Sequence, residues 1–194
     1  MKQTFTIQLV ACIGKMQSGK DTLAEHLINF KRFAFADKLK ETAYMLGWNG
    51  LKDEKGRWLL QQLGTEIGRT YDKKVWINHL LDGIRTDIIQ NLKTHEKSKL
   101  NFIITDCRYL NEVEELRKFT KSVNDFFGYE IMKMTTVKII RPELNQEGKE
   151  HQHTSEIELD KIQDIDYTLV NDGDFHDYIQ KCAQFEQWLI QNSD

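Results

Sequence analysis

A stretch near the N-terminus combines glycine, serine and lysine in an arrangement suited to binding phosphate. Its nine residues are Gly14, Lys15, Met16, Gln17, Ser18, Gly19, Lys20, Asp21 and Thr22. Glycine lets a backbone wrap around an anion in conformations that a side chain would obstruct. The loop N–H groups would then converge on the phosphate at the start of a helix, and Lys20 would reach the outer phosphates. The pattern G-x-x-x-x-G-K therefore predicts a nucleotide-phosphate loop, the alternative being an ordinary turn that contains glycine.

The segments on either side of this loop support the phosphate interpretation. Residues 5–13 are predicted to form a strand that runs into the loop. Residues 22–30 are predicted to form the helix that leaves it, with Leu23, Ala24, Leu27 and Ile28 on one face. A strand, a loop and a helix in this order are the context that the motif requires.

A second candidate site follows the apolar strand predicted at residues 101–106. An apolar run on both faces is typical of a parallel strand covered by helices, and ligands bind at the carboxyl edge of such sheets. Asp106 and Arg108 would lie at that edge, together with the phosphate loop. Asp106 could orient a substrate hydroxyl or a metal-bound water, and Arg108 could hold a phosphate through two hydrogen bonds. The alternative is a helix-capping aspartate beside a surface arginine.

The remaining pattern predicts an α/β fold with a five-stranded parallel sheet flanked by helices on both faces, of the P-loop kinase type. Further strands are expected at 33–36, 135–140 and 167–170, and residues 120–134 stay unassigned. Helices are expected from Asp37 to Gly47, from Arg57 to Gly64, after Asp72, from Asn111 to Lys118 and after Asp174. We expect a single domain over residues 1–194, with an acceptor-binding region at about 37–98 and a lid at about 142–160.

Composition excludes several classes of protein. The 194 residues carry a net charge of -3, which argues against a dedicated binder of nucleic-acid polymers. No apolar run approaches transmembrane length and no signal-peptide pattern is present, so a cytoplasmic protein, of a cell or of an infected host cell, is expected. Cys12, Cys107 and Cys182 are far apart and form no C-x-x-C pair, which favours reduced buried thiols. His151 and His153 are interpreted as polar loop residues rather than metal ligands.

The phosphate loop resembles the G-K-x-x-S-G-K-D-T loop of the deoxynucleoside monophosphate kinases of phages. The likeness continues, in the order of that family, over residues 35–40, 57–69, Trp76, 106–108, 140–142, 153–156 and 170–173. These blocks span most of the chain and are specific as a group, although each is weak alone. Animal-type phosphomevalonate kinases share the loop, the Asp-x-Arg block and a similar closing turn, and are the nearest alternative.

The resemblance implies transfer of phosphate from ATP, with Mg²⁺, to a (deoxy)nucleoside 5′-monophosphate. Lys20, Asp106 and Arg108 are the implied catalytic residues. The phosphate loop, Arg141, Asn171 and Gly173 would bind ATP. The implied substrate-binding residues are Asp37, Lys38, Lys40, Arg57, Gln62, Arg69, Trp76, Asp106 and Arg108. The resemblance leaves a homodimer open.

Two residues depart from the pattern of the family. Asp21 replaces the usual magnesium-binding hydroxyl, so that either Asp21 or Thr22 would bind the metal. Cys107 stands where the phage enzymes carry Thr.

Two alternatives stay open: a kinase for another phosphorylated acceptor, such as phosphomevalonate, and a P-loop switch protein that binds nucleotide without transferring phosphate. Against a switch, the guanine-specificity block Asn-Lys-x-Asp is absent.

Overall fold

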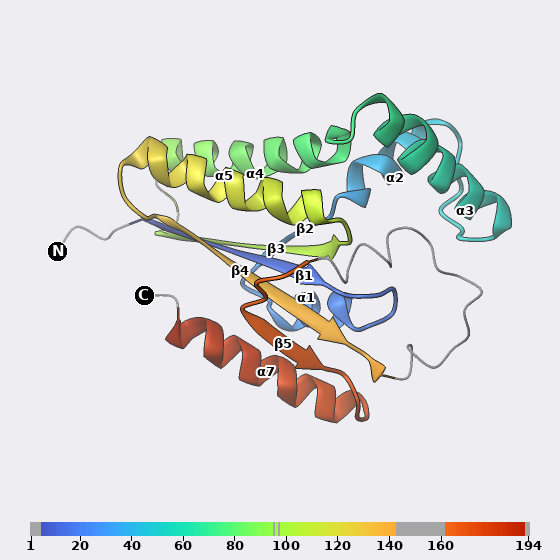
Figure 1. The fold of residues 1–194 in the computed structure, drawn as a ribbon. Helices are drawn as coiled ribbons and strands as arrows, with labels where there is room; N and C mark the ends of the chain where they lie inside the picture. The colour runs from blue at the N-terminus through green and yellow to red at the C-terminus, as the bar shows by residue number, and fades with distance from the viewer. Residues whose placement is uncertain (1–4, 95, 97, 143–161, 193–194) are drawn as a thin grey trace.

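A five-stranded parallel sheet lies between two layers of helices (Figure 1). The computed structural model describes residues 5–94, 96, 98–142 and 162–192. The strands are β1 (Thr6–Ile13), β2 (Lys31–Phe33), β3 (Lys99–Cys107), β4 (Met132–Ile140) and β5 (Tyr167–Val170). Their order in the sheet is β2-β3-β1-β4-β5, so the first strand is the central one. The predicted fold class is confirmed.

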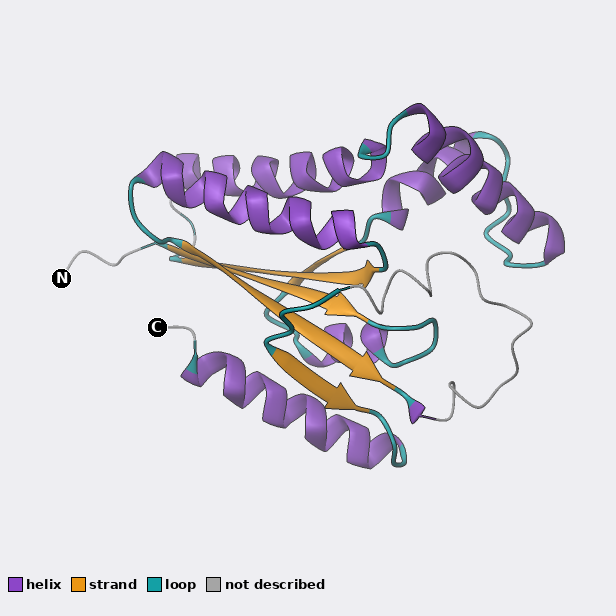
Figure 2. Ribbon diagram, viewed as in Figure 1, coloured by secondary structure: helices purple, strands orange, loops and turns teal. Residues whose placement is uncertain are grey.

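Helices cover both faces of this sheet, as the colouring by secondary structure in Figure 2 makes clear. The helices are α1 (Lys20–His26), α2 (Ala36–Met45), α3 (Glu54–Gln61), the π-helix η1 (Gln62–Arg69), α4 (Val75–Thr94), α5 (Leu110–Phe127) and α7 (Phe175–Gln191). α4 and α5 pack on one face, and α1 and α7 pack on the other. No described helix is long and apolar enough to cross a membrane.

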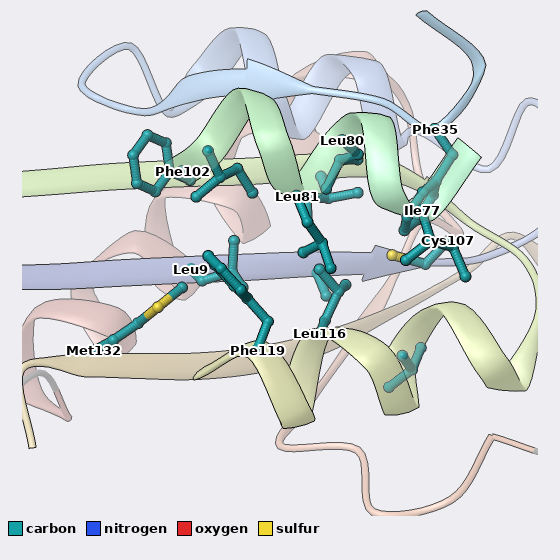
Figure 3. Packing of buried hydrophobic residues seen from close by; sticks show 14 of the residues in the cluster. Leu9, Phe35, Ile77, Leu80, Leu81, Phe102, Cys107, Leu116, Phe119 and Met132 are labelled. Carbon is teal, nitrogen blue, oxygen red and sulfur yellow. The ribbon is translucent and has the colours of Figure 1, made fainter. Parts of the chain in front are cut away.

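The strand β1 is buried on both faces because it faces both helical layers. Its alternate residues Leu9 and Ala11 belong to the core under α4 and α5, which also contains Leu80, Phe102 and Leu116 (Figure 3). The intervening residues belong to the second core, under α1 and α7; its members include Val10, Cys12, Leu23, Cys182 and Phe185. This two-sided burial explains why the strand is a continuous apolar run. All three cysteines are buried free thiols, as predicted.

A bulge interrupts the pairing of β1 with β3 near the carboxyl edge of the sheet. Ala11 pairs with Ile104 but Ile13 pairs with Cys107, so β3 has one extra residue there. Ile104 and Cys107 therefore both face the core under α4 and α5, although they are three residues apart. A bulge changes the direction of the side chains beside it. The side chain of Asp106 therefore does not follow the alternation of side-chain direction that a regular strand would have.

Several predicted boundaries are wrong, for local reasons. α1 ends at His26 rather than near residue 30, and Ile28 is exposed beyond it. The strand expected at 33–36 is Lys31–Phe33, because the backbone already turns into α2 at Ala36. α5 extends to Phe127 instead of Lys118, and β4 begins at Met132, so these two elements fill most of the unassigned segment 120–134.

The helix expected to end at Gly64 instead continues to Arg69. α3 passes directly into η1, which contains Gly64. A Cβ at Gly64 would lie 3.0 Å from Leu39 of α2, so this glycine permits close packing of two helices and does not end one. The bulk of the lid predicted at 142–160, with His151 and His153, lies outside the described residues.

Asn124 joins the end of α5 to the start of β4. Its side-chain carbonyl accepts the N–H groups of Ile131 (3.0 Å) and Met132 (2.8 Å), and its amide donates to the carbonyl of Met132 (2.9 Å). We expect Asn124→Ala to lower the free energy of unfolding by about 2 kcal/mol, because it leaves backbone groups without partners. Urea denaturation measures this. The control Asp125→Ala removes only an exposed ion pair with Lys121 and should change stability little.

Candidate active site

The phosphate loop lies between β1 and α1, with the backbone conformation that its glycines permit. Gly19 has φ of 110° and Gln17 has φ of 64°, both in the left-handed region. A Cβ at Gly14 would lie 2.6 Å from the carbonyl oxygen of Ile139, and one at Gly19 would lie 2.7 Å from the ring of Tyr178. Larger residues would therefore disturb the loop at both glycines. This geometry fits a loop that encloses phosphate at a helix N-terminus.

Lys20 is buried with its ammonium group inside the loop. Its side chain donates hydrogen bonds to the carbonyls of Gly14 (2.8 Å) and Lys15 and to the hydroxyl of Ser18 (3.3 Å). It forms no ion pair with any carboxylate in the described part of the chain. Burial, followed by the positive charge of Arg108, lowers the pKa of Lys20 to about 8. A buried cation that pairs with no described carboxylate is suited to an anionic ligand.

Beside the loop is a polar cavity of about 300 Å³. Its lining residues are Gln17, Gly19, Lys20, Asp21, Thr22, Arg141, Asn171, Gly173, Asp174, Phe175 and Tyr178. Three residues distant in sequence bond the loop backbone: Asn171 donates to the carbonyl of Ser18 (3.0 Å), Tyr178 to that of Gly19 (2.9 Å) and Arg141 to that of Gln17 (3.5 Å). The structure thus brings Arg141, Asn171 and Gly173 beside the loop.

A second cavity, of about 230 Å³, opens at the ends of β3 and η1. It is lined by Phe35, Ala36, Leu39, Leu60, Gln61, Gly64, Thr65, Arg69, Trp76, Asp106, Arg108, Tyr109 and Glu112. Four of the predicted substrate-binding residues, Arg69, Trp76, Asp106 and Arg108, therefore meet in one place. Arg108 lies near enough to Lys20 to lower its pKa, so the two cavities are neighbours at the carboxyl edge of the sheet.

Asp106 binds the first turn of α2 through both carboxylate oxygens. It accepts the N–H groups of Phe35 (2.8 Å) and Ala36 (3.0 Å), which have no partner inside the helix. Asp37, predicted to cap α2, instead lies in its first turn, accepts the N–H of Ala34 (3.0 Å) and pairs with Arg32. Burial raises the pKa of Asp106, while the two amides and Arg108 lower it less strongly. Asp106 therefore connects β3 to α2.

Other predicted substrate-binding residues lie outside the lining of this cavity. Lys38 pairs with Glu41, and the exposed Arg57 donates to the carbonyl of Lys52 (2.8 Å). Lys40 and Gln62 are partly exposed and do not line the cavity. Helix α2 reaches the cavity through Ala36 and Leu39 instead.

Sequence reasoning missed Glu112, Tyr109 and Tyr178. Glu112 is 1% exposed, and its carboxylate accepts hydrogen bonds from Arg69 (2.8 Å) and from the N–H groups of Arg108 (2.7 Å) and Tyr109 (3.0 Å). The ring of Tyr109 lies 4.0 Å from the guanidinium carbon of Arg69. The capping signature pairs such a glutamate with Ser, Thr, Asp or Asn three residues earlier, and Tyr109 stands there instead, so this signature does not indicate Glu112. Tyr178 had appeared only as part of an apolar helix face.

Asp21 and Thr22 both line the cavity beside the loop. No described residues form a cluster of three or more His, Cys, Asp or Glu that could hold a metal alone. Mg²⁺ in kinases is commonly bound by one or two protein oxygens together with substrate phosphates. The oxygens of Asp21 and Thr22, next to a phosphate loop, fit that arrangement.

Comparison with known proteins agrees with this geometry. A protein of Acanthamoeba polyphaga mimivirus, named "Putative deoxynucleotide monophosphate kinase", is 27% identical over 209 residues, covering 90% of this chain and 95% of the viral protein. The sheet order and the phosphate loop give the chain the fold of the P-loop kinases. Its resemblance to the deoxynucleoside monophosphate kinases is confirmed over nearly its whole length by this relative. No protein-family model matches the sequence.

Two solved kinase structures are similar to this chain over nearly its whole length. Dephospho-CoA kinase from Campylobacter jejuni has 18% identity and a TM-score of 0.49, with 97% of this chain and 98% of that chain covered. Shikimate kinase from Acinetobacter baumannii has 12% identity and a TM-score of 0.43, with 98% and 96% covered. Because both TM-scores are below 0.5, the fold assignment rests on the sheet order and the phosphate loop.

The lowered pKa of Lys20 leads to a pH-dependent prediction for nucleotide binding. Below about pH 8 the free protein carries the ammonium form, and above it the neutral amine, which attracts phosphate less. We therefore expect the dissociation constant of MgATP, measured by calorimetry from pH 6.5 to 9.5, to rise as the pH passes about 8. The variant Lys20→Met should bind more weakly and lack this step. Unchanged wild-type affinity up to pH 9.5 would contradict the prediction.

Proposed function

We propose that this kinase transfers the γ-phosphoryl group of ATP to a (deoxy)nucleoside 5′-monophosphate and so produces the diphosphate. The observation that carries the proposal is the cavity that unites Arg69, Arg108, Asp106 and two aromatic side chains beside the phosphate loop. Cations suit the acceptor phosphate, and Trp76 and Tyr109 offer rings on which a planar base can pack. The name of the mimivirus relative supports the same substrate class.

In this proposal the protein acts mainly by positioning its substrates and neutralising their charge. Lys20 and the loop amides hold the β- and γ-phosphates of ATP. When bound, Mg²⁺ would neutralise phosphate charge, and Asp21 or Thr22 would hold it. Arg141, Asn171 and Gly173 border the part of the site that takes the rest of the ATP molecule. We also propose that the acceptor binds to the region at about 37–98. The whole chain, residues 1–194, would form one P-loop kinase domain.

Arg108 would hold the acceptor phosphate. Its side chain lines the acceptor cavity and has no hydrogen bond or ion pair with any residue that the structure describes. Its positive charge acts on Lys20, so two cations face the space in which the γ-phosphoryl group would move. Two adjacent cations repel each other, and two phosphates placed between them would remove that repulsion. The acceptor and ATP would therefore be attracted to the same edge of the sheet.

A panel of acceptors tests the proposed function. The protein is incubated with MgATP and each deoxynucleoside or ribonucleoside monophosphate, and separately with phosphomevalonate and dephospho-coenzyme A. Formation of nucleoside diphosphate supports the proposal. Turnover with either of the other acceptors alone would favour a kinase for a different phosphorylated compound. Tight binding of nucleotide without transfer to any acceptor would favour a P-loop switch.

Substitution of Arg108 tests the acceptor site directly. Arg108→Lys keeps a positive charge but loses the planar pair of donors that grips a phosphate, and Arg108→Ala loses both. We expect kcat/KM for the acceptor to fall in both variants, by about 2–4 kcal/mol of transition-state stabilisation for Arg108→Ala. The affinity for ATP should change little.

The matched control is Arg85→Lys, at an exposed arginine of α4 that pairs with Asp82. Its kinetics should equal those of the wild type. Wild-type kcat/KM in a folded Arg108→Ala protein would show that the acceptor phosphate binds elsewhere.

A further inference from the structure

Two arginines line the acceptor cavity, but their surroundings differ. Arg69, at the end of η1, donates to the buried carboxylate of Glu112 at 2.8 Å and stacks on the ring of Tyr109 at 4.0 Å. Arg108, at the end of β3, has no such partner for its side chain among the described residues. The guanidinium of Arg69 is thus held by an ion pair and a ring, and that of Arg108 has neither among the described residues.

Glu112 produces this difference through three hydrogen bonds. One carboxylate oxygen accepts Arg69, and the other accepts the backbone N–H groups of Arg108 and Tyr109. The same carboxylate therefore fixes the backbone from which the Arg108 side chain projects, but forms no hydrogen bond or ion pair with that side chain. Three elements meet at this carboxylate: the end of η1, the turn after β3 and the first turn of α5.

We propose that Glu112 is a positioning residue of the acceptor site: it fixes Arg69 against Tyr109 as a wall of the cavity and leaves the acceptor phosphate to Arg108 alone. This inference rests on the proposed function, because it takes the cavity to be the site of a phosphorylated acceptor. The inference assigns different roles to Arg69 and Arg108. The sequence does not distinguish these roles, because the two residues carry the same charge.

The chemistry of glutamate explains why a neutral replacement would not suffice. A carboxylate offers acceptor sites on both oxygens, and all three partners of Glu112 are donors. In Glu112→Gln one oxygen becomes an NH₂ group, which would face a donor and leave it unpaired in a buried place. Arg69 would also lose its counter-ion and become a second free cation beside the acceptor.

The first test compares the two arginines in the unmodified protein. Side-chain ¹⁵N spectra report how freely each guanidinium rotates, and the signals are assigned by their loss in Arg69→Lys and Arg108→Lys. We expect slow rotation for Arg69 and fast rotation for Arg108 in the free protein. Addition of each deoxynucleoside monophosphate in turn should shift and slow the Arg108 signals, with a smaller change at Arg69.

The second test is the kinetics of Glu112→Gln. We expect the kcat/KM for the acceptor to fall at least about tenfold, with the dissociation constant of MgATP unchanged. The effect should not add to that of Arg69→Met, since residues that act as one unit are non-additive. The matched control is Glu115→Gln, one turn along α5, whose carboxylate pairs with Lys74 and Lys118 outside the cavity. Its kinetics should match the wild type.

The outcomes separate this inference from the proposed function. If the two guanidinium groups rotate equally fast in the free protein, or if a monophosphate shifts Arg69 as much as Arg108, the role of Glu112 is overturned. The same conclusion follows if a folded Glu112→Gln variant keeps wild-type kcat/KM. If Arg69 is slow and Arg108 is fast but no monophosphate changes either signal, the Glu112 arrangement holds and the nucleoside monophosphate acceptor is wrong. If Glu112→Gln fails to fold, the spectra of the wild-type protein still show whether Arg69 is fixed and Arg108 is mobile, and so still test the role of Glu112.

Discussion

The parallel pairing of β1 with β3 is the constraint on which the site depends. Parallel strands end at the same edge of a sheet, so the loop after β1 and the residues at the end of β3 must meet. Lys20 follows β1 in the chain. Asp106 lies near the carboxyl end of β3, and Arg108 follows that strand. Because β4 pairs with the other side of β1, Arg141 is brought to the same edge. One register thus brings together side chains that are up to 121 residues apart, from Lys20 to Arg141.

Two buried carboxylates then fix the elements around this edge. Asp106 binds the N-terminus of α2, and Glu112 binds Arg69 together with the turn after β3. Burial raises the pKa of both carboxyl groups, and their hydrogen bonds offset part of that effect. A buried acceptor is stable only when donors surround it, so each carboxylate specifies which backbone groups must lie beside it. The cavity at the ends of β3 and η1 is consequently bordered by elements that these two carboxylates connect.

The cations of the site are less completely satisfied than its carboxylates. Lys20 is bonded only to neutral oxygens of its own loop, and Arg108 has neither a hydrogen bond nor an ion pair for its side chain within the described residues. Positive charge that has no ion pair among the described residues is costly to hold beside a phosphate loop when no ligand is bound. It provides in return a strong attraction for phosphate, and this is the electrostatic arrangement that phosphoryl transfer requires.

The sequence by itself determined the class of the fold, the phosphate loop and the strand that carries Asp106, because these depend on short apolar runs and on glycines at fixed spacing. It also placed Arg69, Trp76 and Arg108 near one another through their resemblance to a family. It misplaced Asp37 as a cap, because propensity does not register that Asp106 on another strand accepts the first N–H groups of α2. It ended a helix at Gly64, because propensity does not register that this glycine packs against Leu39 of another helix. Glu112, the bulge in β3 and the different surroundings of Arg69 and Arg108 were decided only by the tertiary structure. Each depends on contacts between elements far apart in the chain, for which local patterns hold no information.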